Sequence, residues 1–431
     1  MGHKLMLVEH IILSLVVILG LSLLAQSLSK WLRFPFASIL VVLGFVASEL
    51  VVLAGVDTGI RADNFQAIIF YIFIPILIFE SAYNLDKTQL KKNLIIVLSL
   101  AIIAMLVTCL IAAALLFYGI GHASGFPWMA ALITGAILAA TDPVAVVAKL
   151  KEMKAPKRIA VLLEGESLFN DAAAIVLFGV FLSMAAATSS TSFAAMDYSP
   201  VDISIRFLSV FIGGGVTGLV VGLSLGLLQR KINQCLVTGV LSLVVAYGSY
   251  LLAEYFMVSG VMSTLLAALS FSIIVQGNTD LDGVSLTRHD AKIVSNNKYL
   301  WDVLSYVANV SVFLVMGAVI TLEMFEQRWL AMLIAIVSLL IARAISVYGV
   351  MFCFSFFKNL EVSLSSQTVI VWGGLRGAVT LALALSLPTS LEYWWTIQSI
   401  AFGVVMFSLF IQAPTIQMLA AKLLVNKNEK I

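Results

Sequence analysis

Five carboxylates and two arginines interrupt apolar stretches of this sequence that otherwise hold few charges. They are Glu80, Asp142, Glu164, Glu166, Asp171, Arg343 and Arg376. A charged side chain in apolar surroundings is costly, so such residues indicate a functional site unless they only form buried ion pairs. Because two arginines cannot pair with five carboxylates, the remaining carboxylates must be protonated, solvated or bound to a cation.

The most acidic of these segments covers residues 164–171 and reads Glu-Gly-Glu-Ser-Leu-Phe-Asn-Asp. On a helix, the spacing of Glu164, Ser167 and Asp171 places their side chains on one face. The small residues at 172–174 would let another helix or an ion approach Asp171 closely. Burial favours the protonated form of a carboxyl group, and a bound cation favours its ionised form. We therefore expect a proton and a cation to compete for Asp171.

Two further segments predict helices that are broken inside an apolar run. Thr141-Asp142-Pro143 places a proline beside a carboxylate, and proline frees backbone carbonyl groups that suit a hard cation. Residues 373–377 read Gly-Gly-Leu-Arg-Gly, and these glycines weaken a helix around Arg376. Interrupted helices at matching places in two halves of a chain are typical of binding sites in inverted-repeat transporters.

The composition predicts a membrane protein. Hydrophobic residues make up 61% of the 431 residues and charged residues 11%, and the mean hydropathy is +1.07. An ordinary soluble domain has about 25% charged residues, so a chain this apolar needs lipid around it. The net charge of +2 gives no argument for a nucleic-acid partner. The scattered cysteines and histidines predict no disulfide framework, resident metal or other cofactor.

Apolar stretches of about 20 residues can cross a bilayer, and they predict an all-α polytopic membrane protein of about thirteen transmembrane helices. The expected spans lie near residues 8–28, 36–54, 64–84, 94–119, 127–148, 159–187, 205–228, 235–254, 257–276, 299–321, 329–355, 364–388 and 394–421. We expect a single membrane domain over residues 1–431. It would consist of two inverted six-helix repeats, at about 8–187 and 235–421, joined by a linking helix at about 205–228. The broken helices would be the fifth of each repeat, and they would cross.

An odd number of spans places the two termini on opposite sides, and the distribution of Lys and Arg decides which side is which. Most of the 25 basic residues then lie in loops on one side, and only Lys4, Arg61, Arg206 and Arg328 lie in loops on the other. Basic loops face the cytoplasm. The C-terminus is therefore predicted to be cytoplasmic and the N-terminus outside.

Together these segments resemble the monovalent cation:proton antiporter family, on its NhaP/NHE branch. The matching pieces are Pro75 to Phe79-Glu80-Ser81, Thr141-Asp142-Pro143, Glu164 to Asp171, and Gly373-Gly374-Leu375-Arg376-Gly377. Their order, spacing and placement on helices match the family over essentially the whole chain. The resemblance implies a secondary active transporter, not an enzyme, that exchanges Na⁺ or Li⁺ for H⁺ by alternating access.

The resemblance also implies roles for single residues. A Na⁺ ion would be bound by Asp171, Asp142, Ser167 and Thr141, with Asn170 beside the site. The family would place Glu80 in contact with the site asparagine. Arg343 would form a structural ion pair with Glu164, with Glu166 as the alternative partner, and Arg376 would be structural near the helix crossing.

The stoichiometry and the assembly are further expectations from the family. Asn170 stands where the electrogenic relatives carry a second aspartate, and an asparagine cannot take up a proton at physiological pH. The expected exchange is therefore electroneutral, one H⁺ for one Na⁺, with Asp171 as the shared carboxylate. The family implies a homodimer in which a six-helix core moves against a dimerisation domain. The long C-terminal domain of animal relatives is absent, which favours a prokaryotic plasma-membrane protein of pH homeostasis.

The residues leave other functions open. A K⁺/H⁺ antiporter of the same fold would differ in cavity geometry, which the sequence does not determine. A cation channel needs a continuous lined pore, whereas the carboxylates here form one cluster, so a channel is less favoured. An intramembrane enzyme would need a serine or metal dyad with a base, and no such pattern is present.

Overall fold

The computed structural model describes residues 2–32, 34–53, 68–120, 126–190, 200–232, 234–276, 288–357 and 360–425. Every regular element among these residues is a helix, which confirms the predicted all-α class. The elements up to residue 190 are α1 (Gly2–Leu32), α2 (Phe36–Leu53), η1 (Ile69–Phe73), α4 (Ile74–Asn84), α5 (Lys87–Leu98), η2 (Ser99–Ala104), α6 (Met105–Gly119), α7 (Trp128–Ala139), α8 (Val144–Glu152) and α9 (Lys157–Ser190). The later ones are α10 (Pro200–Ile232), α11 (Cys235–Tyr255), α12 (Gly260–Gln276), α13 (Arg288–Val319), α14 (Leu322–Phe354), α15 (Leu364–Gly373), α16 (Ala378–Leu385), α17 (Trp394–Phe407), η3 (Ser408–Gln412), α18 (Ala413–Ala420) and η4 (Ala421–Val425), where η marks a π-helical segment.

Within these ranges, nine helices are long and apolar enough to cross a membrane. Shorter apolar helices cover Val16–Leu32, Phe36–Leu50, Ile69–Asn84 and Gly260–Gln276, where four further spans are expected. The chain is therefore a multi-pass membrane protein. The total of about thirteen spans and the inverted repeat stay predictions.

The two predicted helix breaks are both present. Residues 140–143 separate α7 from α8, and residues 374–377 separate α15 from α16. Pro143 cannot donate a backbone hydrogen bond, and it lies directly before α8. The second break contains Gly374 and Gly377, which pack so closely on other side chains that neither position has room for a Cβ atom. Sequence therefore determines where both helices stop.

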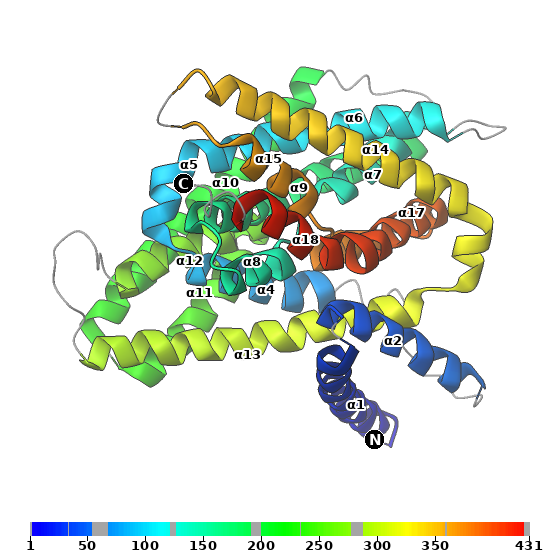
Figure 1. Ribbon diagram of the computed structural model, residues 1–431. Coiled ribbons are helices and arrows are strands. Elements are labelled where there is room, and N and C mark those ends of the chain that lie inside the picture. Colours follow the sequence, from blue (N-terminus) through cyan, green and yellow to red (C-terminus); the bar gives the residue numbers. More distant parts are fainter. Residues whose placement is uncertain are drawn as a thin grey trace.

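By their contacts the helices form two bundles, and in Figure 1 the helices α1, α2 and α13 of the second bundle lie along the lower side. The α9 bundle comprises α5 to α9 and α14 to α18, with contacts such as α6 on α7 and α14 on α17. The α13 bundle comprises α1, α2, α4 and α10 to α13, with contacts such as α2 on α13 and α10 on α12. Helix α9 touches α5 and α7 in its own bundle and α10 and α12 in the other. The helix that carries Asp171 thus lies where the two bundles meet.

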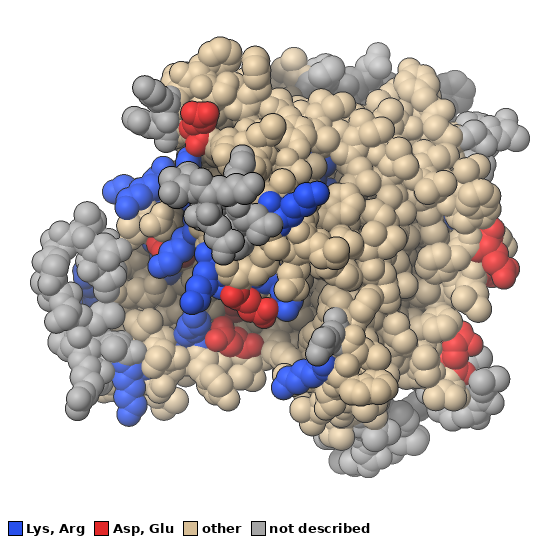
Figure 2. Space-filling model, viewed as in Figure 1, with Lys and Arg blue, Asp and Glu red and all other residues tan. Residues whose placement is uncertain are grey.

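Lys and Arg side chains gather toward one end of the molecule. In Figure 2 most of the visible Lys and Arg side chains lie over the left half of the face, and the described charged side chains seen toward its right edge are acidic. Most of the surface between them is uncharged, as expected for a face in contact with lipid. This asymmetry agrees with the sorting of basic loops in the sequence, although the cytoplasmic assignment of the basic end stays a prediction.

The packing of α10 on α12 depends on glycine. A Cβ atom at Gly214 would collide with the backbone of Ser259, directly before α12. A Cβ atom at Gly218 or Gly222 would collide with the α12 backbone at Ser263 or Ala267 respectively. These glycines are four residues apart and share one face of α10, which is how small residues let membrane helices approach closely. Within the α13 bundle, the backbones of α10 and α12 can therefore pack in direct contact only because these positions are glycines.

We expect Gly218→Ala to destabilise the protein, because the new methyl group would push α10 away from Ser263. Overpacking of this kind costs about 1–3 kcal/mol. Thermal melting of the purified protein in detergent measures the change. The matched control is Gly349→Ala on α14, where an added Cβ meets nothing within 4 Å, so a helix gains up to about 1 kcal/mol from the better helix former. Equal melting temperatures for the two variants would contradict this account of the packing.

Candidate functional site

The two helix breaks touch each other. The backbone N–H of Asp142 donates to the carbonyl of Leu375 at 2.8 Å, and the Thr380 hydroxyl donates to the carbonyl of Ala140 at 3.4 Å. The Cα atom of Gly377 lies against the Asp142 side chain, so that any Cβ there would overlap the carboxylate. The crossing predicted from the sequence is therefore present, and it places Asp142 at its centre.

Helix α9 presents its polar face to the first break. The Ser167 hydroxyl donates to the carbonyl of Thr141 at 2.5 Å. The Asn170 amide donates to the carbonyl of Ala139 at 3.0 Å and to the Thr141 hydroxyl at 3.3 Å. One turn of α9 thus closes the gap that the break leaves in the helical hydrogen bonding of α7.

Asp171 completes this group from the same turn of α9. It is 9% exposed, its carboxylate lies near the Thr141 backbone N–H and the Asp142 side chain, and its Oδ1 atom has no protein partner in the described ranges. Asp142 uses its own Oδ1 to accept from the Val144 N–H at 3.1 Å, where α8 begins.

The structure therefore brings together five of the residues expected at the cation and proton site: Thr141, Asp142, Ser167, Asn170 and Asp171. Glu80, which was also expected there, bonds instead to Asn84 and Ser305. Their side chains and the freed carbonyl groups supply oxygen atoms, which are the ligands that hard cations prefer. A carboxylate in such a place can hold either a cation or a proton. This arrangement can therefore exchange one for the other.

The predicted ion pair between Arg343 and Glu164 is wrong, because Arg343 pairs with Glu166. Its Nη1 donates to Glu166 Oε1 at 2.8 Å and its Nη2 to Oε2 at 3.2 Å. Glu164 instead binds Lys151 at 2.7 Å near the surface. Two residues along a helix differ by about 200° in direction, so only one of these glutamates can face α14.

Arg343 also supports the second break. Its Nη2 donates to the carbonyl of Ile370 at 3.1 Å and its Nε to that of Val371 at 3.3 Å. These carbonyls belong to the last turn of α15, which has no helical partner for them. A positive charge at a helix C-terminus is also favoured by the helix dipole. Gly374 lets the guanidinium pack directly on the break.

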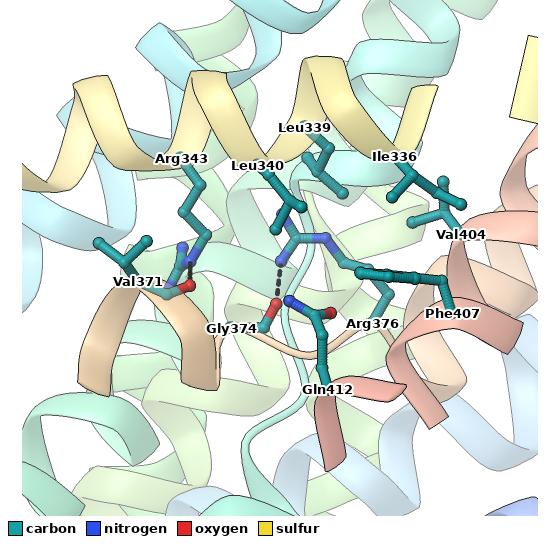
Figure 3. A pocket seen from close by; sticks show the side chains of 10 residues that line it. All are labelled: Ile336, Leu339, Leu340, Arg343, Val371, Gly374, Arg376, Val404, Phe407 and Gln412. Carbon is teal, nitrogen blue, oxygen red and sulfur yellow. Dashed lines mark hydrogen bonds between the residues drawn. The ribbon is translucent and has the colours of Figure 1, made fainter. Parts of the chain in front are cut away.

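Arg376 lies on the second break itself, as expected for a residue near the crossing. It is 1% exposed, and its Nη1 donates to the carbonyl of Gly374 at 2.9 Å. Its Nε and Nη2 atoms have no hydrogen-bond partner among the residues that the structure describes. Figure 3 shows its guanidinium in a small cavity between α14, α15, α17 and η3.

The predicted contact between Glu80 and Asn170 is also wrong. Glu80 accepts from the Asn84 amide at 2.7 Å and lies 3.4 Å from the Ser305 hydroxyl of α13, whereas Asn170 Oδ1 has no partner in the described part of the chain. Asn84 also donates to Asp302 at 3.1 Å. Asp302 was not among the residues expected at the site, although it is also a carboxylate inside an expected span, 299–321.

A comparison with known protein families shows which family the chain belongs to. The family described as "Sodium/hydrogen exchanger, transmembrane" matches residues 14–422. The chain belongs to this family. It is a multi-pass membrane protein of the cation/proton antiporter type, a transporter and not an enzyme.

The relatives carry the same description. The chain is 35% identical to the Na⁺/H⁺ antiporter ApNhaP of Aphanothece halophytica, over 96% of this chain and 74% of the relative. It is 33% identical to the low-affinity Na⁺/H⁺ antiporter NhaS1 of Synechocystis, over 95% and 73%. The solved structure of the sodium proton antiporter MjNhaP1 from Methanocaldococcus jannaschii has the same fold, with a TM-score of 0.74 and 24% identity over 97% of this chain and 99% of that one.

We expect Arg343→Ala to lower the melting temperature strongly, because it leaves Glu166 buried without its partner. The two side chains are 6% and 2% exposed, and breaking such a pair costs about 3–5 kcal/mol. The matched control is Lys151→Ala, which breaks the pair with Glu164 at side chains that are 65% and 28% exposed, at a cost of about 0–1 kcal/mol. Thermal unfolding in detergent checks both. Similar losses in the two variants would show that burial does not decide the strength of these pairs.

Proposed function

We propose that the chain exchanges Na⁺, or Li⁺, for H⁺ by alternating access, with Asp171 as the carboxylate that binds either ion. The observation that carries this proposal is the position of Asp171: it is buried at the contact of two broken helices, and its Oδ1 atom lacks a protein partner among the described residues. The similarity to the Na⁺/H⁺ antiporters ApNhaP and NhaS1 supports sodium as the cation.

The charges around the crossing support a one-for-one exchange. Asp142, Asp171 and Glu166 carry three negative charges when ionised, against two positive charges on Arg343 and Arg376. Electrostatic interactions link Asp171 to Asp142, Glu166 and Arg376, and Arg376 to Arg343. One negative charge is left over. One Na⁺ or one H⁺ neutralises it, and because an unbalanced charge at membrane depth is expensive, the site favours holding one of the two ions at a time.

The packing of α9 supports alternating access. The site is built from α7, α9 and the α15–α16 break of the α9 bundle, and α9 also contacts α10 and α12 of the α13 bundle. A shift of one bundle against the other would therefore move Asp171 between two sides. We place the protein in the plasma membrane as a homodimer, with the basic end and the C-terminus in the cytoplasm.

Asp171→Ala and Asp142→Ala should each abolish exchange in a protein that still folds, because each removes carboxylate oxygen that no lipid or neighbour replaces. The assay is proton flux in proteoliposomes on addition of Na⁺, Li⁺ or K⁺. Glu152→Ala is the control, since that carboxylate is 63% exposed in a surface pair with Lys149, and its flux should equal that of the parent. Full activity in purified Asp171→Ala would overturn the site, and a preference for K⁺ would replace sodium as the substrate.

Sodium flux should be independent of membrane potential if one H⁺ moves against one Na⁺. A cycle that moved one net charge would gain or lose about 2.3 kcal/mol per 100 mV, which changes its end point strongly. Proteoliposomes whose potential is clamped with potassium and valinomycin provide the test. A rate or end point that follows the imposed potential would show that a second group, such as Asp142 or Glu80, titrates during the cycle.

A further inference from the structure

The cavity beside the helix crossing contains a charged group that the proposed exchange does not use. It is lined by Arg343, Arg376, Gly374, Gln412 and apolar side chains of α14, α15 and α17. It has room for about one water molecule. Arg376 points two nitrogen atoms, Nε and Nη2, at this space without a protein partner among the described residues. A buried guanidinium with two unused donors needs an acceptor there.

Gln412 is the neutral polar side chain that faces Arg376 across this cavity. It ends the π-helical segment η3, is 4% exposed, and its Oε1 accepts from the Ser408 hydroxyl at 2.8 Å. This bond fixes the carboxamide, whose nitrogen lies on the side of Gly374 in Figure 3. A π-helical turn re-aims the side chains at its end and is frequent at functional sites.

The charges that face Arg376 decide where it would move if it were released. Arg343 on α14 repels it, whereas Glu166 and Asp171 on α9 attract it. Both oxygens of Glu166 already accept from Arg343. Asp171 is therefore the facing carboxylate that has no arginine partner. An Arg376 guanidinium that turned toward Asp171 would occupy the place beside the carboxylate that the cation is expected to take.

We propose that Gln412 is a positioning residue that, through one buried water, holds Arg376 on the α15–α16 break and keeps it from competing with the cation at Asp171. The water accepts from Arg376 Nη2 and from Gln412 Nε2 and donates to the Gly374 carbonyl, which has a second lone pair beyond the one used by Nη1. Gln412 thereby sets the cation affinity of the site. This inference rests on the proposed role of Asp171.

The test measures KM for Na⁺ and Vmax in proteoliposomes for Gln412→Leu. Loss of a hydrogen bond that holds a charged group corresponds to a change of about tenfold, so KM should rise by that factor while Vmax stays close to that of the parent. Gln412→Glu, which pairs with Arg376 directly, should restore a low KM. The matched control is Gln398→Leu, a carboxamide on α17 that is 5% exposed and bound to the Ala384 carbonyl, where KM should not change.

A merely structural Gln412 would give a lower Vmax or melting temperature at unchanged KM, and that result overturns the inference. If Gln412→Leu does not fold, the longer and more flexible Gln412→Met gives the same two outcomes. In an Arg376→Gln background, Gln412→Leu should raise KM no further, since the competing charge is gone, and a full additional rise would also overturn it. An unchanged KM together with an inactive Asp171→Ala rejects this inference alone, whereas an active Asp171→Ala rejects the proposed function beneath it.

Discussion

The site depends on the backbone hydrogen bond between Asp142 and Leu375, 2.8 Å long, where two broken helices meet. Inside a bilayer every backbone polar group must find a partner in the protein, so a helix can stop there only if something else takes up its free groups. Each break does this for the other. Gly377 makes the contact close enough, since any side chain there would displace the Asp142 carboxylate. The need to pair the free backbone groups of both breaks therefore explains why the Asp142 carboxylate lies among so many oxygen atoms.

The same constraint explains why the neighbouring side chains are polar. Asn170 donates to a carbonyl at the C-terminal end of α7 and Ser167 to a carbonyl in the break that follows it. Arg343 donates to the carbonyls that α15 leaves free. Arg343 brings a buried positive charge with it, and Glu166 balances that charge. Arg343 and Glu166 thus support the breaks by pairing their free backbone groups and each other's charge. Asp171 Oδ1, in contrast, has no hydrogen-bond partner among the described residues.

Much of the fold and most of the site could be predicted from the sequence, because proline, glycine and buried charge leave local marks. Both breaks lie where Pro143 and the glycines at 373–377 indicated, and the residues that line the crossing are those that the carboxylate pattern singled out. The errors concern packing between distant segments. The choice between Glu164 and Glu166 depends on the rotation of α9 against α14. The partner of Glu80 depends on α4 facing Ser305 and not Asn170. Neither the rotation of α9 nor the orientation of α4 can be read from the local sequence.

Asn170 links the geometry of the site to its charge. Its amide nitrogen donates both to the Ala139 carbonyl and to the Thr141 hydroxyl, so the end of α7 depends on a donor at this position. An ionised aspartate accepts hydrogen bonds only, and in the same place it would leave the Ala139 carbonyl without a partner and add a second negative charge beside Asp171. The Asn170 amide therefore has two effects: it supports the break as a hydrogen-bond donor, and its neutrality leaves the site with a single excess negative charge. A donor at residue 170 therefore serves both the support of the break and the proposed exchange of one monovalent cation for one proton.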